Sequence, residues 1–186
     1  HICERLSATG RLIGIDQDEA AIAAAGKRLE PFQNQVTIIR SNYCDMVPRL
    51  AEIGVTGVDG ILLDLGVSSY QLDNAERGFT YREDVPLDMR MDQRNALSAY
   101  EVVNDYSEEN LSRMLHEYGE ERFARKIAHN ICVSRQQAPI RTTGELIEII
   151  KRSIPAKIRA TGGLSGNPYR SEPGTYRSVG VTGRHD

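Results

Sequence analysis

The sequence predicts an α/β protein in which a parallel sheet is followed by a mainly helical region. Short apolar runs that end in an acidic residue, at 11–16 and 61–64, have the character of strands buried on both faces. Helical patterns alternate with the strands in the order β-α-β-α-β, which implies parallel strands joined by crossovers. After residue 107 the apolar residues recur with helical spacing, and the charge changes from acidic to basic. These three observations are the basis of the predicted fold class.

The first half of the chain contains the alternating elements. They are a strand at 11–16, a helix at 20–29, a β-branched strand at 36–39 and a short helix at 47–53. Asp18 and Glu19 precede the alanine-rich helix, where acidic side chains favour the positive end of the helix dipole. We therefore expect a parallel sheet to begin with these two strands.

The run 60–65 is predicted to be the central strand of this sheet, with Asp64 near its carboxyl end. Open α/β sheets bind ligands at the carboxyl ends of their strands, so Asp64 is a candidate ligand residue. The alternative is a strand followed by a turn that Asp64 caps. Loops at 16–17, 41–45 and 64–71 would leave the same edge of the sheet. An acid such as Asp16 at this edge can accept hydrogen bonds from both hydroxyls of a ribose.

Composition indicates a folded protein in a reducing compartment. An apolar content of 40% is enough for a core. No run approaches the roughly 18 apolar residues of a membrane span, and the first residues do not have a signal-peptide pattern. The three cysteines are widely spaced, and the four histidines lack the spacing of metal ligands. We expect no metal, no membrane association and a cytoplasmic location.

The charge is unevenly distributed along the chain. Residues 1–112 carry ten Lys and Arg against 19 Asp and Glu, whereas 113–159 carry ten against five. A basic region of this size in an acidic chain indicates a polyanionic partner. The alternative is a solvated helical surface without a partner.

Three helices are predicted in the second half. Ser107 can cap the first, which ends near Gly119, and Phe123, Ile127 and Ile131 define the apolar face of the second. Thr142 and Glu145 form a capping box for the third. The candidates for phosphate contacts are Arg122, Arg125, Lys126, Lys151, Arg152 and Lys157.

The connector at 77–92 is either a functional loop or a segment held by ion pairs.

Several motifs occur in a distinctive order. They are LLDLGVSSYQLD at 62–73, ERGF at 76–79, PLDMRMD at 86–92 and YGEERFA at 118–124. In this order they resemble the bacterial RsmH (MraW) family, which methylates N4 of a cytidine in 16S ribosomal RNA of the small ribosomal subunit. The resemblance covers roughly 2–163. It implies an incomplete class I, Rossmann-like methyltransferase domain that binds S-adenosyl-L-methionine, with an inserted helical substrate domain.

The resemblance also implies roles for individual residues. Asp16 would bind the cofactor ribose, Tyr43 would lie beside the adenine, and Asp64 and Gln71 would surround the methionine end. Asp64 and Ser68 are the candidates for orienting the target amine. The domains implied are a partial cofactor-binding domain at 1–75, an RNA-substrate domain at 76–160 and an irregular tail at 161–186.

The sequence departs from the family pattern at both ends. The family's glycine-rich motif, ending Gly-Gly-His, would precede Ile2, and we do not assign its histidine to His1. After Gly163 the sequence no longer follows the family. Our hypothesis is a frameshift at this point, biological or a sequencing error, which would put the tail out of frame.

Two other functions fit parts of the sequence. Asp16 would also suit a nicotinamide-dependent oxidoreductase, because such enzymes hold the cofactor ribose with an acid in the same position. A non-catalytic RNA-binding or assembly module would explain the basic region alone. Binding of NADH, or RNA binding without methyl transfer, would distinguish these alternatives from a methyltransferase.

Overall fold

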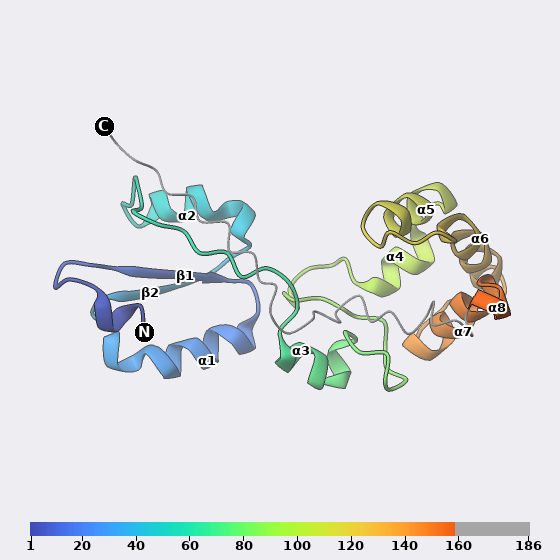
Figure 1. The fold of residues 1–186 in the computed structure, drawn as a ribbon, viewed down its shortest axis with the longest axis horizontal. Coiled ribbons are helices and arrows are strands. Elements are labelled where there is room, and N and C mark those ends of the chain that lie inside the picture. The colour runs from blue at the N-terminus through green and yellow to red at the C-terminus, as the bar shows by residue number, and fades with distance from the viewer. Residues whose placement is uncertain (159–186) are drawn as a thin grey trace. The chain divides into compact units, whose positions relative to one another are not determined.

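The computed structural model describes residues 1–158, which form two compact units (Figure 1). The first unit consists of His1–Leu63 and Met91–Arg94. The second begins with Asp64–Arg90 and continues from Asn95 to the end of the described chain. The predicted tail, 161–186, lies outside the described residues. The functional division into 1–75 and 76–160 stays a prediction.

The first unit contains a two-stranded parallel sheet. Its elements follow the predicted order, as β1 (Leu12–Asp16), α1 (Glu19–Leu29), β2 (Val36–Arg40) and α2 (Met46–Glu52). In the register, Leu12 pairs with Val36 and Asp16 pairs with Arg40. Helix α1 begins where expected, because the Asp18 side chain accepts a hydrogen bond from the backbone N–H of Ala20 at 2.9 Å. In Figure 1 the two helices lie on opposite sides of the strand pair.

The prediction of a central strand at 60–65 is wrong, because this segment has no regular structure. In the described residues the sheet contains β1 and β2 alone. The side chains of the segment are exposed, with Leu62 at 77%. The apolar run reflects a preference for burial, but a strand also needs a neighbouring backbone to receive its hydrogen bonds.

The strands of the sheet are less buried than predicted. Every residue of β1 and β2 is at least partly exposed, whereas buried parallel strands were expected on both faces. Among the described residues of the first unit, Cys3 is the one buried apolar side chain. A pair of parallel strands has an unpaired edge on each side, so it cannot enclose its own side chains.

The second unit is helical, as predicted. Its helices are α3 (Ser69–Asp73), α4 (Ala99–Asp105), α5 (Glu108–Glu117), α6 (Ala124–Arg135), α7 (Thr143–Ser153) and α8 (Ala156–Ile158). The predicted caps are present, since Ser107 accepts from the backbone N–H of Asn110 at the start of α5. Thr142 and Glu145 form the expected capping box of α7. Helices α3, α4 and α8 were not predicted.

Helices α4 to α7 enclose the apolar core of the second unit. Leu111 of α5 and Ile127 of α6 are its most completely buried large side chains. The buried members of the core are Leu87, Val103, Leu111, Ile127, Ala128, Ile131, Ile140, Ile149 and Ile154. The predicted apolar face of the second helix, which includes Ile127 and Ile131, therefore packs inside the unit and is not a contact surface.

The connector before α4 is attached to the start of α7. The N–H of Leu87 donates to the Arg141 carbonyl at 3.0 Å, and the N–H of Thr143 donates to the Val85 carbonyl at 2.9 Å. Gly78 approaches the same connector closely and has φ +74°, and a Cβ there would lie 2.8 Å from the Pro86 carbonyl oxygen. Only glycine fits this position without strain.

We expect Leu111→Ala to destabilise the helical unit by about 2–5 kcal/mol, because it removes a buried side chain and leaves a cavity. Leu111 is 1% exposed. Tyr118→Ala is the control, since Tyr118 follows the same helix and is 83% exposed, and we expect it to change stability by less than about 0.5 kcal/mol. Denaturant unfolding followed by circular dichroism measures both, and equal losses would contradict the described packing.

Candidate functional site

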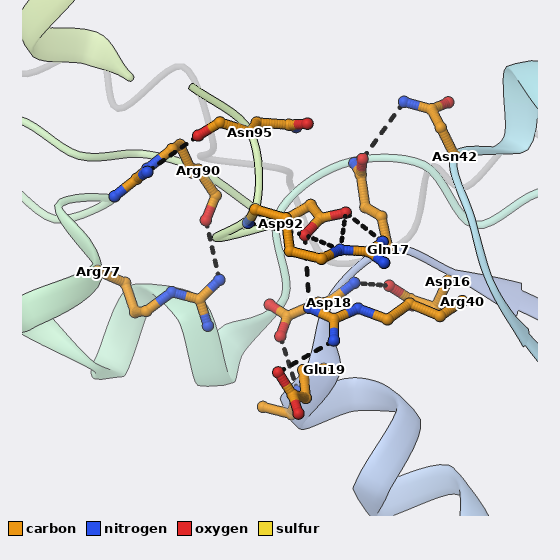
Figure 2. A network of polar contacts seen from close by, with 12 residues as sticks. Asp16, Gln17, Asp18, Glu19, Arg40, Asn42, Arg77, Arg90, Asp92 and Asn95 are labelled. Carbon is orange, nitrogen blue, oxygen red and sulfur yellow. Dashed lines mark hydrogen bonds and ion pairs between the residues drawn. The ribbon is translucent and has the colours of Figure 1, made fainter. Parts of the chain in front are cut away.

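The carboxyl edge of the β1–β2 sheet brings two predicted loops together. The register places Asp16 opposite Arg40, so both strands end at the same edge. The N–H of Ser41 donates to the Asp16 carbonyl at 2.9 Å, and the Asn42 amide donates to Gln17 Oε1 at 3.3 Å. Figure 2 shows this bridge between the loops. The sequence prediction that the 16–17 and 41–45 loops share one edge is confirmed.

The Asp16 carboxylate lies just before α1. Its Oδ1 accepts a hydrogen bond from the backbone N–H of Asp18 at 2.8 Å, and the residue is exposed (Figure 2). Among the described residues, no other donor bonds to this carboxylate. A carboxylate offers about four lone-pair sites. Its geometry therefore leaves acceptors for the two vicinal hydroxyls of a ribose.

Tyr43 belongs to the loop that follows β2. It begins a short 3-10 helix, Tyr43–Asp45, which Asn42 caps by accepting from the backbone N–H of Cys44 at 3.0 Å. The Tyr43 side chain is 51% exposed. Asn42 thus fixes the start of this turn and also links it to Gln17 beside Asp16. The exposed Tyr43 ring beside this turn can offer a face to a flat heterocycle.

Ser68 and Gln71 lie in the second unit and together begin α3. The Ser68 hydroxyl accepts from the N–H of Gln71 at 3.2 Å, and Gln71 Oε1 accepts from the N–H of Ser68 at 3.0 Å. Gln71 is 5% exposed. The Ser-x-x-Gln spacing is a capping-box signal that the sequence analysis did not use. Both side chains therefore have a structural role at the helix start.

Asp64 is the first residue of the second unit and lies in an irregular, exposed segment. It bonds to no described side chain or backbone group. Its predicted place at the end of a central strand depended on the strand at 60–65, which does not form. The role of Asp64 therefore stays a proposal.

Asp92 is a buried residue of the first unit. The sequence analysis did not identify it as a residue that holds two segments together. Arg94 donates to both of its oxygens, with Nε to Oδ1 at 2.9 Å and Nη2 to Oδ2 at 2.6 Å. Arg40 Nη2 donates to Asp92 Oδ1 at 3.4 Å, while Arg40 Nη1 donates to Glu19 at 3.1 Å (Figure 2). Asp92 thereby attaches the segment Met91–Arg94 to the edge that carries Asp16.

The pair Asp88 and Arg90 repeats the same arrangement inside the second unit. Arg90 Nη2 donates to Asp88 Oδ2 at 2.7 Å, and the Arg90 N–H donates to Asp88 Oδ1 at 2.8 Å. Arg77 Nη2 donates to the Arg90 carbonyl at 3.0 Å, and Arg90 Nη1 donates to the Asn95 carbonyl at 2.9 Å (Figure 2). The connector was interpreted either as a functional loop or as a segment held by ion pairs. The second interpretation fits both Asp-x-Arg motifs, Asp88 with Arg90 and Asp92 with Arg94.

The described residues offer neither a metal centre nor a membrane span. No three His, Cys, Asp or Glu side chains of residues 1–158 come together as potential ligands. In the same part of the chain, every helix is too short or too polar to cross a bilayer.

Asp92 makes the stability of the first unit depend on pH. The hydrogen bonds from the Arg94 side chain and backbone, together with the charges of Arg94 and Arg40, hold the pKa of Asp92 well below its usual range. A lowered folded-state pKa stabilises the protein above the ordinary carboxyl pKa of about 4, and this contribution is lost as the pH falls below that value.

We therefore expect Asp92→Asn to destabilise the first unit at about pH 7 and to have a smaller effect at about pH 3. Denaturant unfolding at the two pH values measures the difference. Asp105→Asn is the control, because the Asp105 side chain is exposed and bonds to no described residue. A loss of stability from Asp92→Asn that is the same at both pH values would contradict the described ion pair.

Comparison with known proteins identifies the family. The model of the MraW methylase family matches residues 1–169. A protein of Agathobacter rectalis, "Ribosomal RNA small subunit methyltransferase H 2", is 56% identical over 186 residues, which is all of this chain and 57% of the relative. "Ribosomal RNA small subunit methyltransferase H" of Lachnospira eligens is 61% identical over 180 residues, or 97% of this chain and 55% of the relative.

A third relative, "Ribosomal RNA small subunit methyltransferase H" of Paenibacillus sp., is 55% identical over 171 residues, which is 87% of this chain and 53% of the relative. The chain thus spans about half the length of these curated relatives. The resemblance predicted from the motifs is confirmed, and the chain belongs to the MraW methylase family.

Proposed function

We propose that the protein transfers a methyl group from S-adenosyl-L-methionine to the exocyclic N4 amine of a cytidine in 16S ribosomal RNA of the small ribosomal subunit. The observation that carries this proposal is the family match over residues 1–169, with relatives named as small-subunit ribosomal RNA methyltransferases. The sheet edge that carries Asp16 supports this proposal, because a carboxylate and an exposed aromatic ring are groups that can bind the ribose and the base of a nucleoside cofactor. The match favours a methyl donor over the nicotinamide cofactor that the sequence left open.

The residues around Asp16 suit S-adenosyl-L-methionine. The Asp16 carboxylate has acceptors left for the ribose hydroxyls, and Tyr43 has an exposed ring in the adjoining loop. When bound, this cofactor supplies an electrophilic methyl group on a sulfonium. Asp64 and Gln71 are proposed for its methionine end on the family resemblance. For Gln71 this role must coexist with its hydrogen bond to the Ser68 backbone.

We propose that the fold is a class I methyltransferase domain with an inserted helical substrate domain. The parallel β1–β2 pair, with an acid at its carboxyl edge, supports the first part. The separate apolar core of the helices, centred on Leu111 and Ile127, supports the second. A helical unit with its own core can present a substrate without help from the sheet.

Asp64 and Ser68 are the proposed orienting groups for the target amine. The lone pair of a cytosine N4 is delocalised into the ring, so the amine is a poor nucleophile and depends on positioning. An Asp64 carboxylate near the amine could accept a hydrogen bond from N4 and hold the proton that leaves it. The Ser68 hydroxyl already accepts one hydrogen bond from Gln71 but keeps its own proton to donate.

The helical unit is proposed to contact the ribosomal RNA. Its basic side chains differ in their availability, because Arg135 donates to the Val103 carbonyl at 2.8 Å and Lys151 pairs with Glu148 at 2.7 Å. Arg122 and Arg125 form no ion pair with any described residue and are open to phosphates. The target base must be unpaired or flipped out of a helix to reach the methyl donor.

We expect Asp16→Asn in the full-length protein to weaken binding of S-adenosylhomocysteine by about 10- to 100-fold. The amide keeps an Oδ1 acceptor for the Asp18 N–H but loses the charge that strengthens the ribose hydrogen bonds. Titration calorimetry measures the affinity. Glu30→Gln, which removes one exposed charge from the same unit, is the control and is expected to bind normally. Equal weakening of RNA binding by Asp16→Asn would argue against separate cofactor and RNA sites.

Small ribosomal subunits that lack the modification provide the test of the reaction. Incubated with the full-length protein and S-adenosyl-L-methionine, they are expected to gain one methyl group on a cytidine, with N4 identified by mass spectrometry of the nucleosides. A methyl group on another atom would refute the proposed specificity, and no methyl transfer would refute the activity.

A further inference from the structure

An open surface cavity of about 340 Å³ lies between α6 and α7 of the helical unit. Helix α6 contributes a stripe of exposed and half-exposed side chains, opposite its buried face. Arg152, from the last turn of α7, completes the wall. The lining residues are Lys126, Asn130, Val133, Ser134, Gln137 and Arg152.

Hydrogen bonds hold the guanidinium of Arg152 in place. Its Nη2 donates to the Ser134 hydroxyl at 2.7 Å, and that hydroxyl donates to the Asn130 carbonyl at 2.6 Å. The Asn130 amide in turn donates to the Ser153 hydroxyl at 2.8 Å, which ties α6 to α7 beside the cavity. One of the five N–H donors of Arg152 is used, so the others can face a ligand.

The cavity has a positive electrostatic character. Helix α6 contains no Asp or Glu between Ala124 and Arg135. Lys126 forms no ion pair with any residue of the described chain. On α7, the charge of Glu148 is balanced by Lys151 at 2.7 Å. Two cations therefore face the cavity, and no carboxylate of residues 1–158 forms an ion pair with either of them.

The composition of the lining matches a nucleotide. A guanidinium fixed by one hydrogen bond can bind a phosphate with two of its remaining donors, and an ammonium adds a second charge. The amide groups of Asn130 and Gln137 can bond to a base or sugar edge, and Val133 offers an apolar contact. The volume lies within the range of small-ligand sites.

We infer that this cavity binds one nucleotide of single-stranded RNA, with its phosphate between Lys126 and Arg152. The inference rests on the proposed function and deepens it, because it assigns an RNA contact to a definite place in the helical unit. Each phosphate that a protein neutralises in single-stranded nucleic acid contributes about 0.7 to the slope of log affinity against log salt concentration. Removal of one such charge is therefore measurable as a change in this slope.

The test measures binding of the full-length protein to a fluorescent single-stranded RNA of about 12 nucleotides over a series of salt concentrations. We expect Lys126→Ala to reduce the slope by about 0.7. Lys27→Ala is the matched control, because Lys27 is an exposed helical lysine of the other unit, and its slope should equal the wild-type value.

A second pair of variants tests the guanidinium. Arg152→Lys keeps the charge but loses the bidentate geometry, so we expect weaker binding with an unchanged slope. Arg113→Lys is its control, since Arg113 of α5 also donates one hydrogen bond to a side chain, Asn110, at 3.1 Å. Circular dichroism confirms that each variant folds.

Wild-type affinity and slope in both Lys126→Ala and Arg152→Lys would overturn the cavity assignment. Methyl transfer to small subunits would remain intact in that case, and the proposed function would stand. Failure of the wild-type protein to bind the RNA would overturn the inference, and loss of methyl transfer as well would overturn the proposed function with it.

Discussion

The parallel register of β1 and β2 is the constraint on which the first unit depends. It places Asp16 and Arg40 opposite each other at one edge of the sheet. The exposed Asp16 carboxylate is thus next to Arg40, which bonds to the surrounding segments. Arg40 bonds to Glu19 at the start of α1 and to Asp92 from a distant segment. A shift of one residue in this register would exchange the faces of the sheet and separate these groups.

The helical unit has a different basis for its stability. Its core is formed by apolar residues of four helices together with Leu87, Ile140 and Ile154 from the segments between helices. Its helix ends are satisfied by capping side chains such as Ser98, Ser107 and Thr142. In its described residues the first unit has one buried apolar side chain, Cys3, and relies instead on backbone pairing and on the bonds of Arg40 and Asp92. The proposed cofactor and RNA roles therefore belong to two units whose stability has different physical origins.

Local sequence patterns predicted the local structure well. The strands that end at Asp16 and Arg40, the cap at Ser107 and the capping box at Thr142 each depend on a few adjacent residues. The strand at 60–65 was predicted wrongly, because an apolar run carries no information about whether a neighbouring strand is present to pair with it. The capping box of Ser68 and Gln71 was visible in the sequence but lay within a segment interpreted as a loop. The contact between Arg40 and Asp92 joins residues far apart in the sequence, and no local pattern encodes such a pair.

The most direct test of this account is a crystal structure of the full-length protein with S-adenosylhomocysteine. The account predicts that the ribose hydroxyls lie within hydrogen-bonding distance of the Asp16 carboxylate, at about 2.5–3.0 Å, and that the adenine lies beside Tyr43. A cofactor bound elsewhere, with the Asp16 carboxylate facing solvent, would contradict it.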